Sequence, residues 1–410
     1  MKTQNRCVKP NLGVPPSLGK TRMSLAECFR RSASICVALY VMGAGTLLHA
    51  AAPIVESFDA PGAGTDGDTQ QGTVGVAIND FGTIAGLIRD SQDIRHGFLR
   101  HPDGTFTVFD HPDAGTNGAT EQGTKVEGIN LFGAVVGQYR DANNFDHPYI
   151  REPDGRFVTI SIPNLLGGNG SSINLWGEVV GNFLNLTDVQ NFPVLLHYHG
   201  FLRDPNGTVT LFDPPGSTDT EIPPVGAIND EGSVTGDFWV CNKDQSACTA
   251  HGFIRGHDGK YTSFDVEGAG PDAYSGQGTF PQSINDLGEV VGYYVDVNDV
   301  GHGFVRDIGG AVTPFDIPTV CTTSTPPEDC AYEGTYPDSI NNLGAVTGAY
   351  YGEDGLPHGF WRTVDGSTKR FDLEKAGYST YPSAINDLGV IAGFVYDPNF
   401  AVHGFYALPR

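Results

Sequence analysis

The segment AINDFG, residues 77–82, decides the fold because the chain repeats it six more times. The copies are GINLFG (128–133), SINLWG (172–177), AINDEG (227–232), SINDLG (283–288), SINNLG (339–344) and AINDLG (384–389). In each copy an apolar residue precedes Asn-x-x-Gly, where Asn can cap its own backbone and Gly can adopt a positive φ. Each copy therefore predicts the tight turn of a β-hairpin.

Other features follow each copy in a fixed order. They are an apolar stretch, a His-Gly/Pro-aromatic triplet, a Gly-containing turn and usually Phe-Asp, as in TIAGLI, His96-Gly97-Phe98, HPDGT and Phe109-Asp110. Short stretches rich in β-branched and aromatic residues favour strands, four in each repeat. The repeated Asn residues are 79, 130, 174, 229, 285, 341 and 386. Their spacing, from 44 (174 minus 130) to 56 (285 minus 229), is typical of propeller blades.

The two ends of the repeated region complement each other. The last repeat runs to HGFYALPR (403–410) without a Phe-Asp strand, whereas Phe58-Asp59 near the start has no repeat before it. Pairing the two would remove open strand edges. We therefore predict an all-β, seven-bladed β-propeller over residues 53–410, with four antiparallel strands per blade and the N-terminal strand joining the last blade.

The first 52 residues are expected to be a signal peptide. Arg30 and Arg31 precede the apolar run ICVALYVMGAGTLL (35–48), which is too short to span a bilayer and is followed by small residues. We expect cleavage between Ala50 and Pro53, a secreted protein that is extracellular or periplasmic, and no later membrane span. We also expect a monomer.

The expected mature chain is strongly acidic. Removing residues 1–52 takes away seven of the 24 Lys and Arg and one of the 48 Asp and Glu, which leaves 17 against 47 and a formal charge of −30. Such a surface repels nucleic acid. Cations and basic partners are compatible with it, and a glycan or protein ligand is the partner we expect.

Four cysteines remain after the predicted leader: Cys241, Cys248, Cys321 and Cys330. An even number in an exported chain suggests disulfides. We favour Cys241 with Cys248 and Cys321 with Cys330, since each pair closes a short loop. A zinc site is the alternative, but the spacings do not form a CxxC-like frame.

Residues that recur in every repeat are expected to serve the framework. The recurring histidines are His96, His147, His199, His251, His302, His358 and His403. Because they lie on separate blades, we expect buried, hydrogen-bonded histidines and no metal site. The Asn of Ile-Asn and the Asp of Phe-Asp are expected to satisfy backbone groups at strand ends. The aromatic residue after each His is expected to pack between adjacent sheets.

Residues that occur once are better candidates for function. Insertions fall between Asn and His or between Phe-Asp and the next Asn, so they crowd one face, and His197 lies in one of them. On the strand nearest the axis, Lys125, Glu127, Gln282 and Asp338 are candidates to line the mouth of a channel. We expect a non-catalytic binding module that uses this long-loop face. The alternative is a polysaccharide hydrolase or lyase with a site at the axis.

Signals for chemistry are otherwise weak. The chain has no GxSxG and no HExxH, and GAGTDG (62–67) lacks the helix that a dinucleotide site needs. We expect no cofactor. DVNDVG (296–301) and Asp66-Gly67-Asp68 leave open a structural calcium ion only.

The repeat, with Ile-Asn-Asp/Asn-x-Gly followed by His-Gly-Phe, Asp-Gly and Phe-Asp, resembles that of the HAF-repeat family of bacterial extracellular proteins. The likeness spans nearly all of residues 53–410, although Gly, or Pro148 in the second repeat, replaces the Ala of the naming triplet. The resemblance implies an exported bacterial repeat protein, and it brings no substrate, catalytic residue or cofactor.

Overall fold

The computed structural model describes residues 54–186, 197–244, 246–318, 334–352, 354–373 and 377–408. All of these residues belong to one compact part of the chain. The predicted signal peptide and the second cysteine pair, Cys321 with Cys330, lie outside the described residues. Strands account for 52% of the structure and helices for 3%, so the fold is all-β as predicted. In the described ranges, no helix has the length and apolar character needed to cross a membrane.

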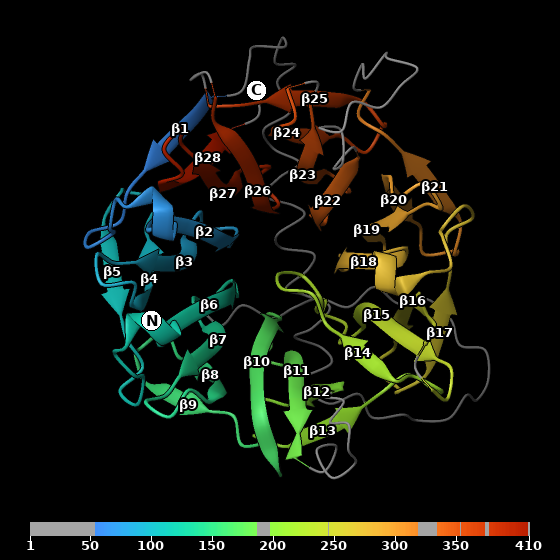
Figure 1. Ribbon diagram of the computed structural model, residues 1–410, viewed down its shortest axis with the longest axis horizontal. Helices are drawn as coiled ribbons and strands as arrows, with labels where there is room; N and C mark the ends of the chain where they lie inside the picture. The colour runs from blue at the N-terminus through green and yellow to red at the C-terminus, as the bar shows by residue number, and fades with distance from the viewer. Residues whose placement is uncertain are drawn as a thin grey trace, which may run out of the picture. The chain divides into compact units, whose positions relative to one another are not determined.

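Every repeat forms one group of four antiparallel strands (Figure 1). Repeat one contains β2 (Gly72–Ile78), β3 (Ile84–Arg89), β4 (Arg95–Arg100) and β5 (Phe106–Phe109). Repeat two contains β6 (Gly123–Ile129), β7 (Val135–Arg140), β8 (Asp146–Arg151) and β9 (Phe157–Thr159). Repeat three contains β10 (Leu165–Ile173), β11 (Val179–Asn185), β12 (Tyr198–Arg203) and β13 (Val209–Phe212). Repeat four contains β14 (Asp219–Glu221), β15 (Val234–Cys241), β16 (Cys248–Arg255) and β17 (Tyr261–Phe264).

The remaining repeats have the same order. Repeat five contains β18 (Gly278–Ile284), β19 (Val290–Val295), β20 (Gly301–Arg306) and β21 (Val312–Phe315). Repeat six contains β22 (Thr335–Ile340), β23 (Val346–Tyr351), β24 (Pro357–Arg362) and β25 (Thr368–Phe371). Repeat seven contains β26 (Ser379–Ile385), β27 (Ile391–Tyr396) and β28 (Val402–Leu408), and β1 (Ile54–Phe58) adds its fourth strand. Repeats three to six are separate four-stranded sheets, and single parallel bridges join the other three groups into a 12-stranded sheet.

The strand β1 pairs antiparallel with β28, from Ile54 opposite Leu408 to Phe58 opposite Gly404. The side chains support this pairing, since His403 Nδ1 lies 2.8 Å from Asp59 Oδ1 and the Tyr406 hydroxyl donates to Glu56. The predicted union of the two chain regions is therefore present as a strand pair.

The repeated asparagines link each group to the next near the axis. Each Asn side chain accepts backbone N–H groups of its own turn, and its Nδ2 donates to the Asn carbonyl of the following repeat at 2.9 to 3.2 Å. The last of these bonds runs from Asn386 to the carbonyl of Asn79. The Asn thus satisfies backbone groups as predicted, and in addition it ties neighbouring groups together.

Two sets of side chains pack between neighbouring groups. The predicted aromatic residues are all fully buried, with 0% exposure: Phe98, Tyr149, Phe201, Phe253, Phe304, Phe360 and Phe405. Further from the axis, an Arg at the end of the third strand lies over the Phe of the preceding Phe-Asp strand. These pairs are Arg100 with Phe58, Arg151 with Phe109, Arg255 with Phe212, Arg306 with Phe264 and Arg362 with Phe315, at 4.6 to 5.1 Å. Such contacts stabilise the seams between groups.

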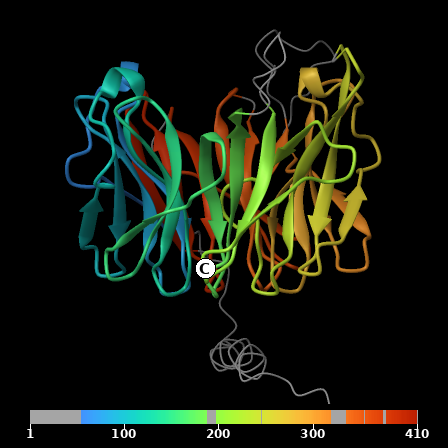
Figure 2. The same cartoon turned by 90° about the horizontal axis from the view of Figure 1, so that it is seen from below.

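The two faces differ in their connections. Tight hairpin turns lie on one face, whereas the longer connections and the short 3-10 helices η1 (Gly67–Thr69), η2 (Gly118–Thr120) and η4 (Ala273–Ser275) lie on the other (Figure 2). On this long-loop face, Cys241 and Cys248 form a disulfide across the β15–β16 hairpin, the pairing that the sequence favours.

Candidate functional site

The first strand of each group lies nearest the axis (Figure 1), and one pair of facing residues on the first and second strands varies most. The pairs are Val74 with Leu87, Lys125 with Gln138, Asn169 with Asn182, Glu221 with Asp237, Phe280 with Tyr293, Tyr336 with Ala349 and Tyr381 with Phe394. The residue just before the first member is a Thr in six repeats, with at most 1% exposure. Framework and variable positions therefore alternate along the same strand.

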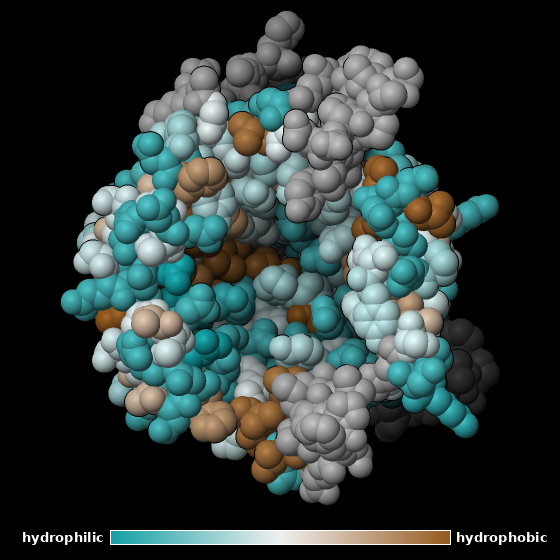
Figure 3. All heavy atoms as spheres, in the orientation of Figure 1, coloured by the Kyte–Doolittle hydropathy of each residue, from teal (hydrophilic) through white to brown (hydrophobic). Residues whose placement is uncertain are grey.

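The variable pairs make the two sides of the axis chemically different. Repeats two, three and four supply Lys, Gln, Asn, Glu and Asp, whereas repeats five, six, seven and one supply aromatic and aliphatic residues. The space-filling view from the long-loop face shows the centre hollowed, with hydrophobic residues on one side and hydrophilic residues on another (Figure 3). A ligand site requires such an asymmetry, whereas a purely structural repeat does not require it.

A second variable position is a β-bulge two residues after the first member of the pair. The register shift in the first strand leaves one extra residue in six repeats: Val76, Glu127, Ser171, Gln282, Asp338 and Ser383. Bulges re-aim side chains and occur next to functional sites. Three of the predicted site residues, Glu127, Gln282 and Asp338, occupy this position.

The predicted candidates do not all converge. Lys125 Nζ lies 2.6 Å from Glu127 Oε1 on the same strand, so this charge pair is internally neutralised. His197 Nδ1 lies 3.1 Å from Asp219 Oδ2 at the rim of repeat four. Gln282 and Asp338 lie at equivalent positions of neighbouring repeats. Asp338 is the candidate that joins a wider group of acids and tyrosines.

That group, the axial cluster, consists of Glu221, Asp237, Tyr293, Tyr336 and Asp338. Asp237 is 4% exposed and lies directly opposite Glu221 across β14 and β15. The Tyr293 ring packs edge-to-face on that of Tyr336, with centroids 5.1 Å apart. Burial raises the pKa of Tyr293 above its usual value, and the charges of Asp237 and Asp338 raise it further. Tyr293 therefore lies between the acids of repeat four and the acid of repeat six.

The three carboxyl groups of the axial cluster hold their protons tightly. Burial raises the pKa of Asp338 to about 8. Burial, and then the charge of Glu221, raises the pKa of Asp237 well above its usual value. Burial, and then the charge of Asp219, raises the pKa of Glu221. Strongly shifted acids next to one another in a hollow are a common feature of functional sites.

Aromatic rings extend the axial cluster along repeats five to seven. Phe280 stacks on Tyr293 at 5.2 Å, and Tyr381 stacks on Phe394 at 5.1 Å with an interplanar angle of 10°. Tyr351 links the two stacks, since its ring contacts Tyr336 and its hydroxyl interacts with Tyr381. The acids thus lie beside an aromatic surface rather than among other polar residues.

Glu221 and Asp237 were missed from the sequence. In six repeats the first member of the variable pair precedes the repeated Asn by five residues (79 minus 74, for example), but in repeat four the separation is eight (229 minus 221). The extra residues of the Pro223-Pro224 segment hide the equivalence. The second member always follows Asn by eight residues (237 minus 229), so that count would have found Asp237.

Other acids gather at the opposite, short-turn end of the axis, where they act as framework. A backbone N–H group of the preceding repeat donates to each of the carboxylates of Asp230, Asp286, Asp387 and Asp80 at 2.8 Å. Burial, and then the charges of neighbouring Asp residues, raise the pKa of Asp80 to about 6 and that of Asp230 to about 7.

The recurrent histidines differ from the prediction in one respect. They are not buried, since 18 to 29% of each side chain is exposed. In six repeats the ring bonds the Asp of Phe-Asp, as in His96 Nδ1 with Asp110 Oδ1 at 2.8 Å. That Asp therefore pairs with a side chain rather than with backbone groups. The second repeat has Ser161 at this place, and His147 Nε2 instead lies 3.4 Å from Asp141.

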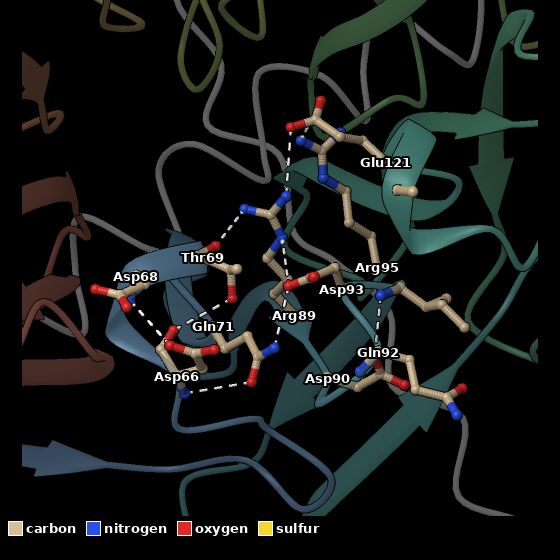
Figure 4. Close-up of polar contacts among 12 residues, drawn as sticks. Asp66, Asp68, Thr69, Gln71, Arg89, Asp90, Gln92, Asp93, Arg95 and Glu121 are labelled. Atoms are coloured by element: carbon tan, nitrogen blue, oxygen red, sulfur yellow. Dashed lines mark hydrogen bonds and ion pairs between the residues drawn. The ribbon is translucent and has the colours of Figure 1, made fainter.

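In the two acidic loops for which the sequence left a calcium ion open, Asp carboxylates accept hydrogen bonds from backbone N–H groups of the same loop. Asp66 Oδ1 accepts the Asp68 N–H, and Asp296 Oδ1 accepts those of Asn298 and Val300. Nearby, Arg89 and Arg95 both reach Glu121, at 3.4 and 2.9 Å, and so bridge repeats one and two (Figure 4). Within the described ranges, no three His, Cys, Asp or Glu side chains converge as a metal site requires.

Comparisons with known proteins bear on the fold. No known protein-family model matches the sequence. No curated protein matches it either. Among solved structures, a streptogramin B lyase is similar with a TM-score of 0.52 and 13% identity, covering 87% of this chain and 98% of that one. A virginiamycin B lyase from Staphylococcus aureus has a TM-score of 0.50 and 14% identity, covering 87% and 99%.

A fungal lectin described as a six-bladed β-propeller is also similar, with a TM-score of 0.39 and 12% identity, covering 77% of this chain and 100% of that one. At such identities the likeness concerns the fold alone. The four-stranded groups around one axis (Figure 1), together with the two lyase matches, make the fold propeller-like.

Proposed function

We propose that the seven four-stranded groups are the blades of one closed propeller. The β1–β28 pairing and the hydrogen bond from Asn386 to Asn79 support closure, because both join the last repeat to the beginning of the described chain. We further propose that the chain is an exported member of the HAF-repeat family, as the leader sequence and the repeat motif suggest.

On this framework, the protein acts as a non-catalytic binding module that takes its ligand at the axis, from the long-loop face. One observation carries this proposal. Seven equivalent residue pairs nearest the axis are polar on one side and aromatic on the other, while the Thr next to them is nearly constant. A half-polar, half-aromatic hollow is the usual character of a site for a small ligand or for one end of a larger one.

The proposal predicts that binding depends on the aromatic side of the axis. Glycan and peptide arrays would be probed with the purified protein and with the Tyr336→Ala and Tyr381→Ala variants. Leu287→Ala is the matched control, because Leu287 is 58% exposed on the short-turn face. Both tyrosine variants should lose the array signal and the control should keep it. Signals that survive both tyrosine variants would place the binding site elsewhere.

A polysaccharide hydrolase or lyase is the second candidate, and the Glu221–Asp237 pair favours it. The two residues face each other on adjacent strands, where Cβ atoms are about 5 Å apart, so their carboxyl groups can reach the separation of about 5 to 10 Å that paired catalytic carboxyls use. Release of reducing ends or unsaturated sugars from a polysaccharide panel, abolished in Glu221→Gln and Asp237→Asn, would establish this activity. Bound but uncleaved polysaccharide would exclude it.

A further inference from the structure

The acids of the axial cluster have no counter-charge within the described part of the chain. Glu221, Asp237 and Asp338 form no salt bridge with any described Lys, Arg or His, although the Lys125–Glu127 pair shows that the same strands can supply one. Of the three, Asp237 is buried, Asp338 is partly exposed and Glu221 is exposed. A buried charge is normally paired, because an isolated one is costly. A protein with a formal charge of −24 over the whole sequence adds to this local excess of negative charge.

The lack of a counter-charge is clearest at Asp237. Asp237 is 4% exposed, and its Oδ2 atom makes no hydrogen bond of good geometry; the Trp239 side chain is the neighbouring polar group that acts on this carboxyl. Over 90% of buried polar groups in folded proteins are satisfied, so an unsatisfied carboxylate oxygen calls for an explanation. It faces Glu221 across the strand pair, and its charge reaches Tyr293, so it belongs to the axial cluster and not to a separate pocket.

A bound metal ion does not explain these acids. Metal ligation needs oxygens within about 2.6 Å of one point, and no such group of three acidic or other ligating side chains occurs in the ranges that the structure describes. The acids instead come from two repeats and border stacked aromatic rings. An extended organic group can contact both, because ammonium and guanidinium ions bind carboxylates and also the faces of aromatic rings.

We propose that the axial cluster binds a positively charged organic group, an ammonium or guanidinium, with Asp237, Glu221 and Asp338 as its hydrogen-bond acceptors and Tyr293 and Tyr336 beside it. This inference rests on the proposed axial binding function and names its ligand chemistry. The charge can come from a small amine or from a Lys or Arg side chain of a basic peptide.

Binding of a cation displaces protons from the acids. The acids that act on Asp237 are Glu221 and Asp219 on β14, and Asp219 is already bonded to His197. Asp237 and Asp338 (β22) both act on Tyr293 (β19), which is the titratable group that they share. The pKa values of Glu221, Asp237 and Asp338 are raised, so at acid pH these groups are neutral and attract a cation weakly. Affinity should therefore increase as the pH rises toward 8.

Isothermal titration calorimetry of the whole protein tests whether the axial cluster binds a cation and whether the affinity increases with pH. The probes are agmatine as the small cation, a hexa-arginine peptide as the macromolecular one and maltohexaose as an uncharged contrast. Both guanidinium probes keep their charge between pH 6 and pH 8.5. We expect at least one of them to bind with an affinity at least about tenfold higher at pH 8.5 than at pH 6, with proton release.

The variants are Asp237→Asn and Asp338→Asn, with Asp154→Asn as the control. Asp154 is 68% exposed on a short turn, so the control makes the same change in net charge away from the axis. Each axial variant should weaken binding about 10- to 100-fold at pH 8.5, whereas the control should stay within about twofold. Because Asn is neutral and close in size to a protonated Asp, thermal melting should show that both axial variants remain folded.

The outcomes separate the two proposals. Agmatine binding with no hexa-arginine binding identifies a small ligand, and the reverse identifies a basic peptide. Cation binding that Asp154→Asn weakens as much as Asp237→Asn does, or absence of binding by both cations, overturns the inference. Maltohexaose binding that needs Tyr336 but not Asp237 overturns the inference and keeps the axial binding function. Ligands that bind independently of Tyr336 overturn both.

Discussion

Replacing Asn341 by alanine tests the chain of hydrogen bonds that joins neighbouring groups at the axis. Asn341 is 4% exposed; its Nδ2 donates to the Asn386 carbonyl at 2.9 Å, and its Oδ1 accepts the N–H groups of Leu343 and Ala345 at 3.1 and 2.9 Å. The substitution removes all three bonds and leaves a buried carbonyl without its donor.

The expected loss follows from these three bonds. At about 1 kcal/mol for each, with an added cost for the unsatisfied carbonyl, the free energy of unfolding should fall by about 3 to 4 kcal/mol. The matched control is Asn298→Ala. Asn298 is exposed in the turn after β19, and its Nδ2 bonds only Asp296 Oδ2, at 3.0 Å, so we expect a change below about 0.5 kcal/mol.

Equilibrium urea unfolding, followed by tryptophan fluorescence, measures both variants. A loss below about 1 kcal/mol for Asn341→Ala, or a loss equal to that of Asn298→Ala, would refute the reasoning. It would mean that packing of the sheets, and not the axial hydrogen bonds, holds the groups together.

Three further predictions concern other parts of the framework. The pKa of Asp230 is raised to about 7, so its proton stabilises the folded state below pH 4, and this contribution is lost as the pH rises through 7. Asp230→Asn should therefore make the melting temperature, measured by differential scanning fluorimetry, less dependent on pH between 5 and 8. An unchanged pH profile would contradict this prediction. Phe304→Ala should lower the free energy of unfolding by about 3 to 5 kcal/mol in urea titrations, because the ring is fully buried between sheets, whereas the half-exposed Phe145→Ala should cost far less. Reduction of the Cys241–Cys248 disulfide, which closes a loop with a sequence separation of 7, should lower the free energy of unfolding by about 2.5 kcal/mol. An identical melting temperature with and without reductant would argue against this prediction.

Much of the framework could be predicted from the sequence, because each repeat has the same turn residues and the same side-chain pattern. The Asn-x-x-Gly turn, the buried aromatic residue after His and the short strands all follow from turn chemistry and from side-chain patterning. Gly82, for example, has a φ of 79°, as its place in the turn requires. Repetition makes such assignments firm, since seven copies must obey one geometry.

Contacts between repeats were harder to foresee. The Arg of His-Gly-Phe-x-Arg recurs in the sequence, but nothing there says that its guanidinium lies over the Phe of the preceding repeat, as Arg306 does over Phe264. Likewise, the spacing of His and Asp by 14 residues is constant, yet only the register of the third and fourth strands makes them partners. Such pairings depend on three-dimensional neighbours that are far apart along the chain.

The candidate site was predicted only in part, for a related reason. Asp338 and Glu127 were recognised because they follow the common spacing, whereas Glu221 was displaced by the insertion in repeat four. Asp237 is an acid on a strand otherwise rich in apolar residues, and its partner could not be assigned without the register of β14 and β15.

The pairing of β1 with β28 also has a consequence for biosynthesis. A polypeptide made from its amino end presents residues 54–58 long before residues 402–408, so β1 finds its neighbour only when the last strand has been made. The pairing of Ile54 with Leu408 spans 354 positions (408 minus 54), so closing the β1–β28 pair carries a large chain-entropy cost. We infer that β1 remains without its strand partner until synthesis reaches residues 402–408.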